Sequence, residues 1–244
     1  MKPFTDRPDD LVVGVLGGMG PHATVDFFSQ LVRVTPADKD WNHLHVIVDN
    51  NPRMPSRSRA YLHGEASPGP YLLAGARRLE AQGAQVIAVP CNSAAYFLAE
   101  TRAGVGARVL DPVEATCEAI VRDPRRPRRP LVLGGVVTHR AELYGKALAG
   151  AGIVPVRPTD AEQQEVLDLI EALKRLDVSD AVVARTEAVL QAGIARGADS
   201  VVLGCTEFGL VAGLLAAVGV PVFNSNELLA RQTVALARTR ASDS

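Results

Sequence analysis

Two apolar segments of the chain end in the same way, and this repeat constrains the fold more than any other feature. Residues 85–89 lead through Pro90 to Cys91, and residues 198–203 lead through Gly204 to Cys205. A Gly-Ala pair opens each segment, and the two cysteines lie 114 positions apart. Near-continuous apolar runs of this length are typical of buried strands in parallel sheets. Both cysteines therefore stand just past the carboxyl end of a predicted strand, where the chemistry of α/β proteins gathers.

A second correspondence supports an internal duplication. Residues 131–135 end in Leu-Gly-Gly, as residues 16–18 do, at a shift of 117 positions. This shift differs by only three residues from the shift between the cysteines. The two correspondences are therefore consistent with one alignment of the two halves. We expect an α/β fold of two pseudo-symmetric domains, each a mostly parallel sheet flanked by helices, with the active site in the cleft between them. The expected boundaries are residues 1–112 plus 225–244 for the domain carrying Cys91, and 113–224 for the domain carrying Cys205.

The alternation of apolar runs with helical periodicity predicts the individual elements. Strands are expected at residues 11–16, 45–49, 85–89, 108–110, 131–133, 198–203 and 220–223. Helices are expected at residues 21–32, 71–82, after Cys91, up to 121, from a Thr159–Glu162 capping box, at 181–196 and at 226–240. Three prolines within residues 122–130 exclude regular structure, and the five arginines there indicate a solvated linker rather than an anion-binding patch.

Composition narrows the functional classes. The 244 residues carry a net charge of −1, so no overall field favours nucleic acid or a membrane surface. Three cysteines are an odd number for a disulfide framework, and no Cys-x-x-Cys or His-x-x-x-His spacing suggests a metal site. The first residues contain no apolar signal core, and no apolar run reaches the roughly 20 residues of a membrane span. We therefore expect a cytoplasmic protein with reduced thiols.

The paired cysteines admit two interpretations. Free cysteine is among the most buried residue types, so either one alone would read as a small core residue. Together, they follow corresponding strands and precede small polar residues that can begin a helix, whose N-terminus favours a thiolate. Two thiols on opposite faces of a substrate carbon can remove a proton from one side and return one to the other. Cys117 lies in the middle of a predicted helix and is interpreted as structural.

The glycine-rich turn after the first strand also leaves alternatives open. Residues 18–23 fit the pattern G-x-G-x-x-A, and Asp49 ends the second strand, which is the dinucleotide fingerprint in outline. The spacing fits only loosely, and the residues 50–52 crowd the place of a ribose. A turn that donates backbone N–H groups to a small carboxylate is the simpler interpretation.

Three further side chains are candidates with ordinary alternatives. Arg57 can hold a carboxylate in a bidentate pair, or be a solvated loop arginine in competition with Arg53 and Arg59. Thr138 can face the cleft or cap a helix. Lys174 can reach a second carboxylate, or simply complement the helix dipole.

Taken in chain order, these motifs resemble the aspartate racemases of the aspartate/glutamate racemase superfamily. The motifs are Gly17-Gly18-Met19-Gly20-Pro21, Asp49-Asn50-Asn51-Pro52 with Pro55 and Arg57, Pro90-Cys91-Asn92-Ser93-Ala94, and Gly204-Cys205-Thr206-Glu207. The resemblance implies racemisation by two cysteines without pyridoxal phosphate or metal, and a homodimer. By position it implies that Cys91 and Cys205 are the acid–base pair, that Asn92, Ser93, Ala94 and Thr206 line the α-carboxylate, and that Arg57 holds the side-chain carboxylate. Thr138 and Tyr144 match a second-domain Thr and Tyr, and Lys174 matches a substrate-contacting lysine if one gap is allowed.

Some positions depart from that pattern and bear on the substrate. They are Ser93 in place of Thr, Ala95 in place of His, Gly134-Gly135 in place of Ala-Thr, Ala141 in place of Ser, and Asn224 in place of Asp. The first hypothesis is a racemase of aspartate or glutamate. The second is another reaction of a small diacid on the same scaffold, decarboxylation or cis–trans isomerisation. The third is a nucleotide-binding or non-catalytic ligand-binding protein, based on the turn at residues 18–23.

Overall fold

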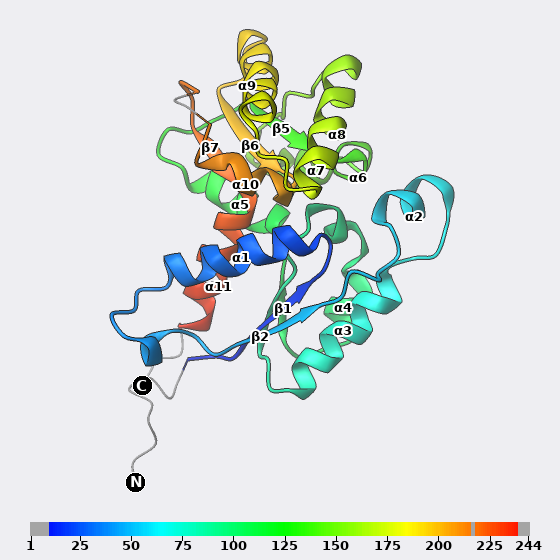
Figure 1. The fold of residues 1–244 in the computed structure, drawn as a ribbon, viewed down its shortest axis with the longest axis vertical. Coiled ribbons are helices and arrows are strands. Elements are labelled where there is room, and N and C mark those ends of the chain that lie inside the picture. The colour runs from blue at the N-terminus through cyan, green and yellow to red at the C-terminus, as the bar shows by residue number, and fades with distance from the viewer. Residues whose placement is uncertain (1–9, 216–217, 239–244) are drawn as a thin grey trace.

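The computed structural model describes residues 10–215 and 218–238, which form two α/β layers, each built on a parallel sheet (Figure 1). The first sheet has the order β2-β1-β3-β4 and the second the order β5-β6-β7, and all pairings are parallel. The strands are β1 (Val13–Gly17), β2 (Val46–Asn50), β3 (Val86–Ala88), β4 (Arg108–Leu110), β5 (Pro130–Gly134), β6 (Ser200–Gly204) and β7 (Val222–Asn224). The predicted fold class, two halves each with a parallel sheet and flanking helices, is confirmed.

The helices begin where the sequence provides start signals. Pro21 occupies the first turn of α1, and the Thr159–Glu162 capping box forms both of its bonds at the start of α8. The α-helices are α1 (Pro21–Val34), α2 (Arg57–His63), α3 (Gly69–Ala81), α4 (Ala99–Ala103), α5 (Pro112–Arg122), α6 (Val136–Arg140), α7 (Leu143–Leu148), α8 (Asp160–Lys174), α9 (Asp180–Ala195), α10 (Gly209–Ala212) and α11 (Ser225–Ala237). The 3₁₀ turns are η1 (Asp40–Asn42), η2 (Asn92–Phe97), η3 (Ala149–Ala151) and η4 (Thr206–Phe208).

Two local expectations need correction. The loop around Arg57 contains a short helix, α2, which begins because the Ser56 hydroxyl accepts the Arg59 amide. The irregular segment expected at residues 122–130 is one residue shorter at each end, since Arg122 is the last residue of α5 and Pro130 is the first residue of β5, a strand position that tolerates proline. The rest of the segment is held by Asp199, whose carboxylate accepts the backbone N–H groups of Arg128 and Arg129.

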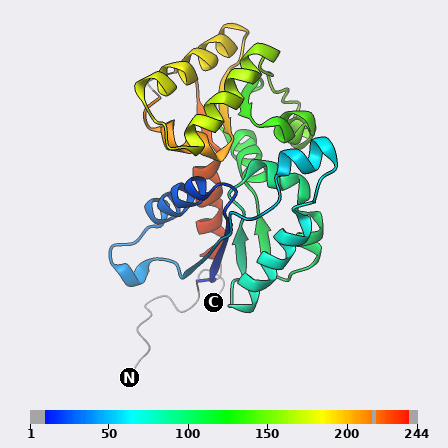
Figure 2. The ribbon, with the colours of Figure 1, turned by 45° about the vertical axis from the view of Figure 1, so that its right-hand side comes forward.

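The chain crosses between the layers through two long helices. After β4, α5 packs Val113, Cys117 and Ile120 into a core with residues of β5, β6 and β7. After β7, α11 packs Leu229 and Val234 into a core with residues of β1, β3 and α1. Figures 1 and 2 show α11, in red, running from the second layer down along α1 into the first. Because α5 and α11 each pack into the core of the half that they enter, we propose domain boundaries at 112/113 and 224/225.

The likeness of the two halves extends to the residues that start these crossings. The Asp111 Oδ1 atom accepts the amides of Val113 and Glu114, and the Asn224 Oδ1 atom accepts the amides of the second and third residues after it. Each half thus enters its crossing helix through an equivalent side-chain cap. Within the described residues, none of the helices combines the length and apolarity that crossing a membrane requires.

Candidate active site

One small cavity between the layers receives both of the predicted catalytic cysteines. Cys91 follows β3 and Cys205 follows β6, and each is the extended residue immediately before a 3₁₀ turn, η2 or η4. The cavity has a volume of about 270 Å³, the scale of a small metabolite rather than of a dinucleotide. From the first half it is lined by Met19, Ser56, Arg57, Ser58, Cys91, Asn92 and Ser93. From the second half it is lined by Gly135, Val136, Leu167, Ile170, Glu171, Lys174, Cys205, Thr206 and Glu207.

The strand-to-turn geometry at each cysteine leaves backbone N–H groups for a ligand. In η2 the Cys91 carbonyl accepts the amide of Ala94, and in η4 the Cys205 carbonyl accepts the amide of Phe208. The Glu207 amide bonds to Cys205. The amides of Asn92, Ser93 and Thr206 begin these turns and so have no acceptor within them. Groups of this kind form an anion-binding site, in particular for a carboxylate.

Cys205 is held in its protonated form by its neighbours. Its Sγ atom donates to the Oε2 atom of Glu207 at 2.9 Å, and that glutamate is 3% exposed. Burial raises the pKa of the Cys205 thiol well above its ordinary value, and the negative charge of Glu207 adds to the increase. Cys91 adds a smaller increase, which is consistent with two thiols that share one cavity. A carboxylate in contact with a thiol is arranged to accept its proton.

Asn92, next to Cys91, is fixed by a buried chain of hydrogen bonds between the halves. Its Oδ1 atom accepts the Tyr144 hydroxyl at 2.6 Å, and its Nδ2 atom donates to the Ser225 Oγ atom at 3.1 Å. The Ser225 hydroxyl in turn donates to the Leu203 carbonyl at 2.6 Å, two residues before Cys205. The Asn92 side chain is thus occupied, and its backbone amide is the group that remains for a ligand.

Two cations and two carboxylates line the same cavity. The Arg57 guanidinium donates to the backbone carbonyls of Pro55 and Met19, both at 3.3 Å. Its buried Nε atom has no partner within the described residues. Burial lowers the pKa of Lys174, but the hydrogen bond and charge of Glu171 and the charge of Glu207 outweigh it, so the net shift is upward. Lys174 is therefore charged at neutral pH, and both cations can bind a carboxylate.

Most of the predicted site residues meet at this cavity. Those that line it are Cys91, Cys205, Arg57, Asn92, Ser93, Lys174 and Thr206. Ala94 lies instead in the core of the first layer, with its amide bonded to the Cys91 carbonyl. Thr138 lines a different cavity behind β5. The sequence reasoning missed Glu207 and Glu171; the signal for Glu207 was its place in the second cysteine motif, two residues after Cys205.

The turn at residues 18–23 is filled by protein. The Gly18 amide donates to the Thr24 Oγ1 atom at 2.9 Å, and a Cβ on Gly18 would overlap the backbone of Asn51. Asp49 pairs with Arg78 at 2.7 Å instead of projecting freely from its strand. Within the described residues, no group of three or more His, Cys, Asp or Glu side chains is arranged to hold a metal ion.

Comparisons with known proteins agree with this arrangement. The chain matches the family model of Asp/Glu/hydantoin racemases over residues 16–233, which include every residue of the cavity. It is 28% identical over 227 residues to the broad specificity amino-acid racemase RacX of Bacillus subtilis, covering 91% of this chain and 96% of that protein.

Solved structures show the same fold. The aspartate racemase of Picrophilus torridus superposes with a TM-score of 0.82 at 28% identity, covering 93% of this chain and 94% of that one. Glutamate racemase isoform RacE1 of Bacillus anthracis has a TM-score of 0.65 at 20% identity, over 93% and 82% of the two chains, and shows the likeness of fold alone. The chain belongs to the Asp/Glu/hydantoin racemase family and is a racemase, hence an isomerase.

Proposed function

We propose that the chain interconverts the L and D forms of aspartate or glutamate by proton transfer between two cysteines, without pyridoxal phosphate or metal. The observation that carries this proposal is the meeting of Cys91 and Cys205, from opposite halves of the molecule, in one cavity of about 270 Å³. Racemisation requires removal of the α-proton on one face and delivery of a proton on the other. One acid–base group from each half meets this requirement.

The polar lining supports a substrate with two carboxylates. Backbone N–H groups at the starts of η2 and η4 can receive the α-carboxylate and stabilise the negative charge that develops when the α-proton leaves. Arg57 and Lys174 can receive the side-chain carboxylate, because both are cations at the cavity wall. The similarity to an enzyme named aspartate racemase supports aspartate, and the similarity to one named broad specificity amino-acid racemase makes a panel of substrates necessary.

Glu207 can remove the proton of the Cys205 thiol before that thiol acts as a base. A thiol acts as a base only after it has lost its own proton. The Cys205 proton passes to the Glu207 carboxylate, the resulting thiolate removes the substrate α-proton, and the Cys91 thiol delivers its proton to the opposite face. In the reverse direction Cys91 is the base, and Cys205 is the acid. Closure of the two halves would exclude water and bring both sulfur atoms to the α-carbon.

Incubation of each enantiomer in D₂O tests this function directly. L- and D-aspartate and L- and D-glutamate are followed by proton NMR for loss of the α-proton and by chiral chromatography for inversion. The expected result is inversion of at least one pair, with α-deuterium in the product formed. Substituted malonate and maleate are run beside them, and turnover of either one without any amino-acid inversion would contradict the proposal in favour of decarboxylation or cis–trans isomerisation.

We further propose that the enzyme acts as a homodimer, because of the resemblance to aspartate racemases, and that it does so in the cytoplasm, where free thiols stay reduced. Light scattering coupled to size-exclusion chromatography measures the assembly, with a mass of twice 25.9 kDa as the expected result. A stable monomer of full activity at assay concentration would contradict the dimer.

A further inference from the structure

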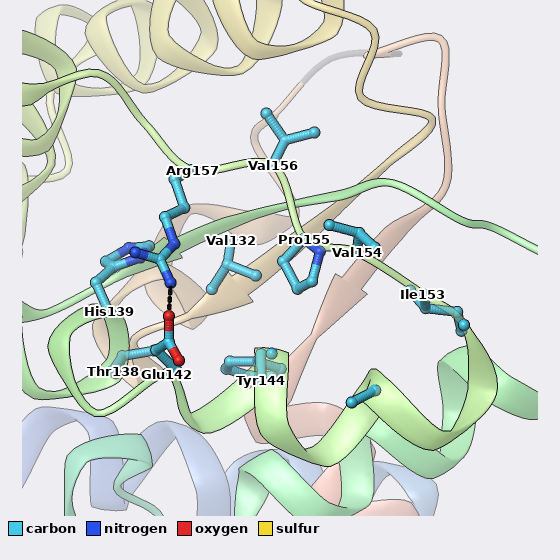
Figure 3. A pocket seen from close by; sticks show the side chains of 13 residues that line it. Val132, Thr138, His139, Glu142, Tyr144, Ile153, Val154, Pro155, Val156 and Arg157 are labelled. Atoms are coloured by element: carbon cyan, nitrogen blue, oxygen red, sulfur yellow. Dashed lines mark hydrogen bonds and ion pairs between the residues drawn. The ribbon is translucent and has the colours of Figure 1, made fainter.

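A second cavity lies in the C-terminal half and shares no lining residue with the cysteine cavity. It has a volume of about 400 Å³ and lies between β5, the helices α6 and α7, and the segment 153–157. Figure 3 shows that its walls are largely apolar. The apolar side chains are those of Val132, Ile153, Val154, Pro155, Val156 and the ring of Tyr144. A cavity of this size and composition suits a small ligand with an apolar body.

Two residues that line this cavity each carry a buried polar side-chain atom that has no hydrogen-bond partner within the described residues. The two atoms are the Thr138 Oγ1 atom, on a side chain that is 3% exposed, and the His139 Nε2 atom. Burial lowers the pKa of His139 to about 4, and the charge of Arg157 contributes, so the ring is neutral at pH 7. A backbone hydrogen bond of the ring with Val132 opposes that shift, and we assign the unpartnered Nε2 atom as the acceptor of the neutral ring. Buried polar atoms normally have partners, so these two indicate a missing group that can both donate and accept a hydrogen bond.

The charges at the rim of the cavity cancel. Arg157 forms an ion pair with Glu142, marked in Figure 3, and the two side chains are 60% and 48% exposed. A ligand that carries a net charge would therefore find no unpaired countercharge there. The rim favours a neutral molecule, and the buried Nε2 atom favours one with a hydroxyl group.

Tyr144 connects this cavity to the catalytic one. Its ring forms part of the wall, while its hydroxyl donates to Asn92, the residue after Cys91. A molecule that contacts the ring therefore acts on a side chain whose other end fixes Asn92.

We propose that this cavity binds a neutral small molecule with an apolar body and one hydroxyl group, and that its occupancy is transmitted through Tyr144 to Asn92. The ligand hydroxyl donates to the His139 Nε2 atom and accepts from the Thr138 hydroxyl. Its apolar body packs against Val132, Ile153 and Val156. The ligand class follows from the lining alone and does not depend on the reaction at the cysteines.

A matched pair of probes tests the hydrogen bond. Titration calorimetry measures the dissociation constants of p-cresol and of 4-methylanisole, which has the same ring but no hydroxyl hydrogen. We expect p-cresol to bind about fivefold more tightly, the effect of one hydrogen bond of ordinary strength. Equal affinity of the two probes, or no binding of p-cresol, would overturn the proposal.

A matched pair of variants tests the location. Gly145 lies on the cavity wall in α7, and a Cβ there meets nothing closer than 3.8 Å, so Gly145→Met is the variant designed to fill the cavity. Gly150 lies on the exposed surface outside the lining, with no atom within 4 Å of a Cβ, so Gly150→Met is the control. We expect loss of p-cresol binding in the first variant only. Unchanged binding in a folded Gly145→Met variant would place the probe elsewhere.

NMR spectroscopy tests, without any activity assay, whether ligand binding in this cavity affects Asn92. In the wild-type protein, p-cresol is expected to shift the NMR resonance of the Asn92 side-chain amide. Tyr144→Phe keeps the apolar wall but removes the hydroxyl, so it should bind p-cresol and lose that shift. A shift of the same size in Tyr144→Phe, or none in the wild-type protein with p-cresol bound, would refute the connection, whatever reaction the cysteines perform.

Discussion

The two halves place their cysteines alike but surround them differently. Cys91 and Cys205 each follow a buried parallel strand and precede a 3₁₀ turn. Cys91 lies in the core of the first layer, next to an asparagine whose side chain is fixed by Tyr144 and Ser225. Cys205 is more exposed and donates to a buried carboxylate. The two halves thus share the backbone position of the thiol, while among the described residues Cys205 alone of the two donates to a carboxylate.

This difference means that the two faces of the substrate meet unequal partners. The thiol of Cys205 has a carboxylate in contact that can receive its proton, and the corresponding position after Cys91 is Ser93, which carries a hydroxyl. We infer that proton transfer at the Cys205 face and proton transfer at the Cys91 face have different barriers.

The largest effect is expected from removal of either thiol. Cys91→Ala and Cys205→Ala should each lower racemisation at least 10²-fold and up to about 10⁴-fold, because one face then lacks its acid or base. In D₂O, each variant should still exchange the α-proton of one enantiomer without inversion, and the preferred enantiomer should differ between the two. Cys117→Ala, in a helix outside the cavity, is the control and should retain activity. Inversion at the wild-type rate in both single variants would end the two-thiol mechanism.

The next largest effect is expected from removal of the Glu207 carboxylate, which accepts the Cys205 thiol proton. Glu207→Gln should slow racemisation about 10²-fold, since the Cys205 proton loses its acceptor. At the same time, removal of the negative charge should lower the pKa of the Cys205 thiol, because that charge is the second cause, after burial, of its increase. Alkylation of Cys205 by iodoacetamide, followed against pH by mass spectrometry, measures this shift. An unchanged alkylation profile would show that Glu207 does not control the thiol.

The paired cysteines could be found from the sequence because both lie at the ends of uninterrupted apolar runs. Strands buried on both faces leave such runs, and the carboxyl ends of parallel strands meet at one edge. The role of Glu207 could not be found in this way, because residues two apart meet only where a 3₁₀ turn brings the chain back. The commitment of Asn92 to Tyr144, 52 positions away, depends on how the two layers pack. The direction of the Thr138 hydroxyl depends on the same packing.

A smaller effect is expected from Cys117, the structural thiol, on the pH dependence of stability. Burial raises the pKa of Cys117 to about 12, with help from Asp111 and Glu114, whereas in the unfolded chain the thiol titrates near 9. The unfolded state therefore loses its proton first, and the free energy of unfolding falls by about 1.4 kcal/mol per pH unit as the pH rises from about 9 to about 12. Below pH 9 this contribution is fully present.

Cys117→Val removes that dependence and keeps the apolar contacts. Relative to the wild-type protein at the same pH, the variant should gain about 3 kcal/mol of stability between pH 7 and pH 11. Urea unfolding at both values measures the difference, and the comparison at pH 7 corrects for any change in packing. A constant difference between the two proteins across this range would mean that the Cys117 thiol ionises in the folded state.

The smallest effect is expected on the unfolding free energy, when the side-chain caps of the two crossing helices are removed. Asp111→Ala and Asn224→Ala each remove an oxygen that accepts two backbone amides, at a cost of about 1 kcal/mol of unfolding free energy. Asp111 also pairs with Arg102 at 2.6 Å, and because that arginine is 39% exposed the pair adds at most about 1 kcal/mol. Asp111→Ala should therefore destabilise slightly more in urea unfolding, and Asp111→Asn, which keeps the cap, should cost only the difference. If Asp111→Asn costs as much as Asp111→Ala, the ion pair and not the cap holds the start of α5, and the two crossings are not equivalent.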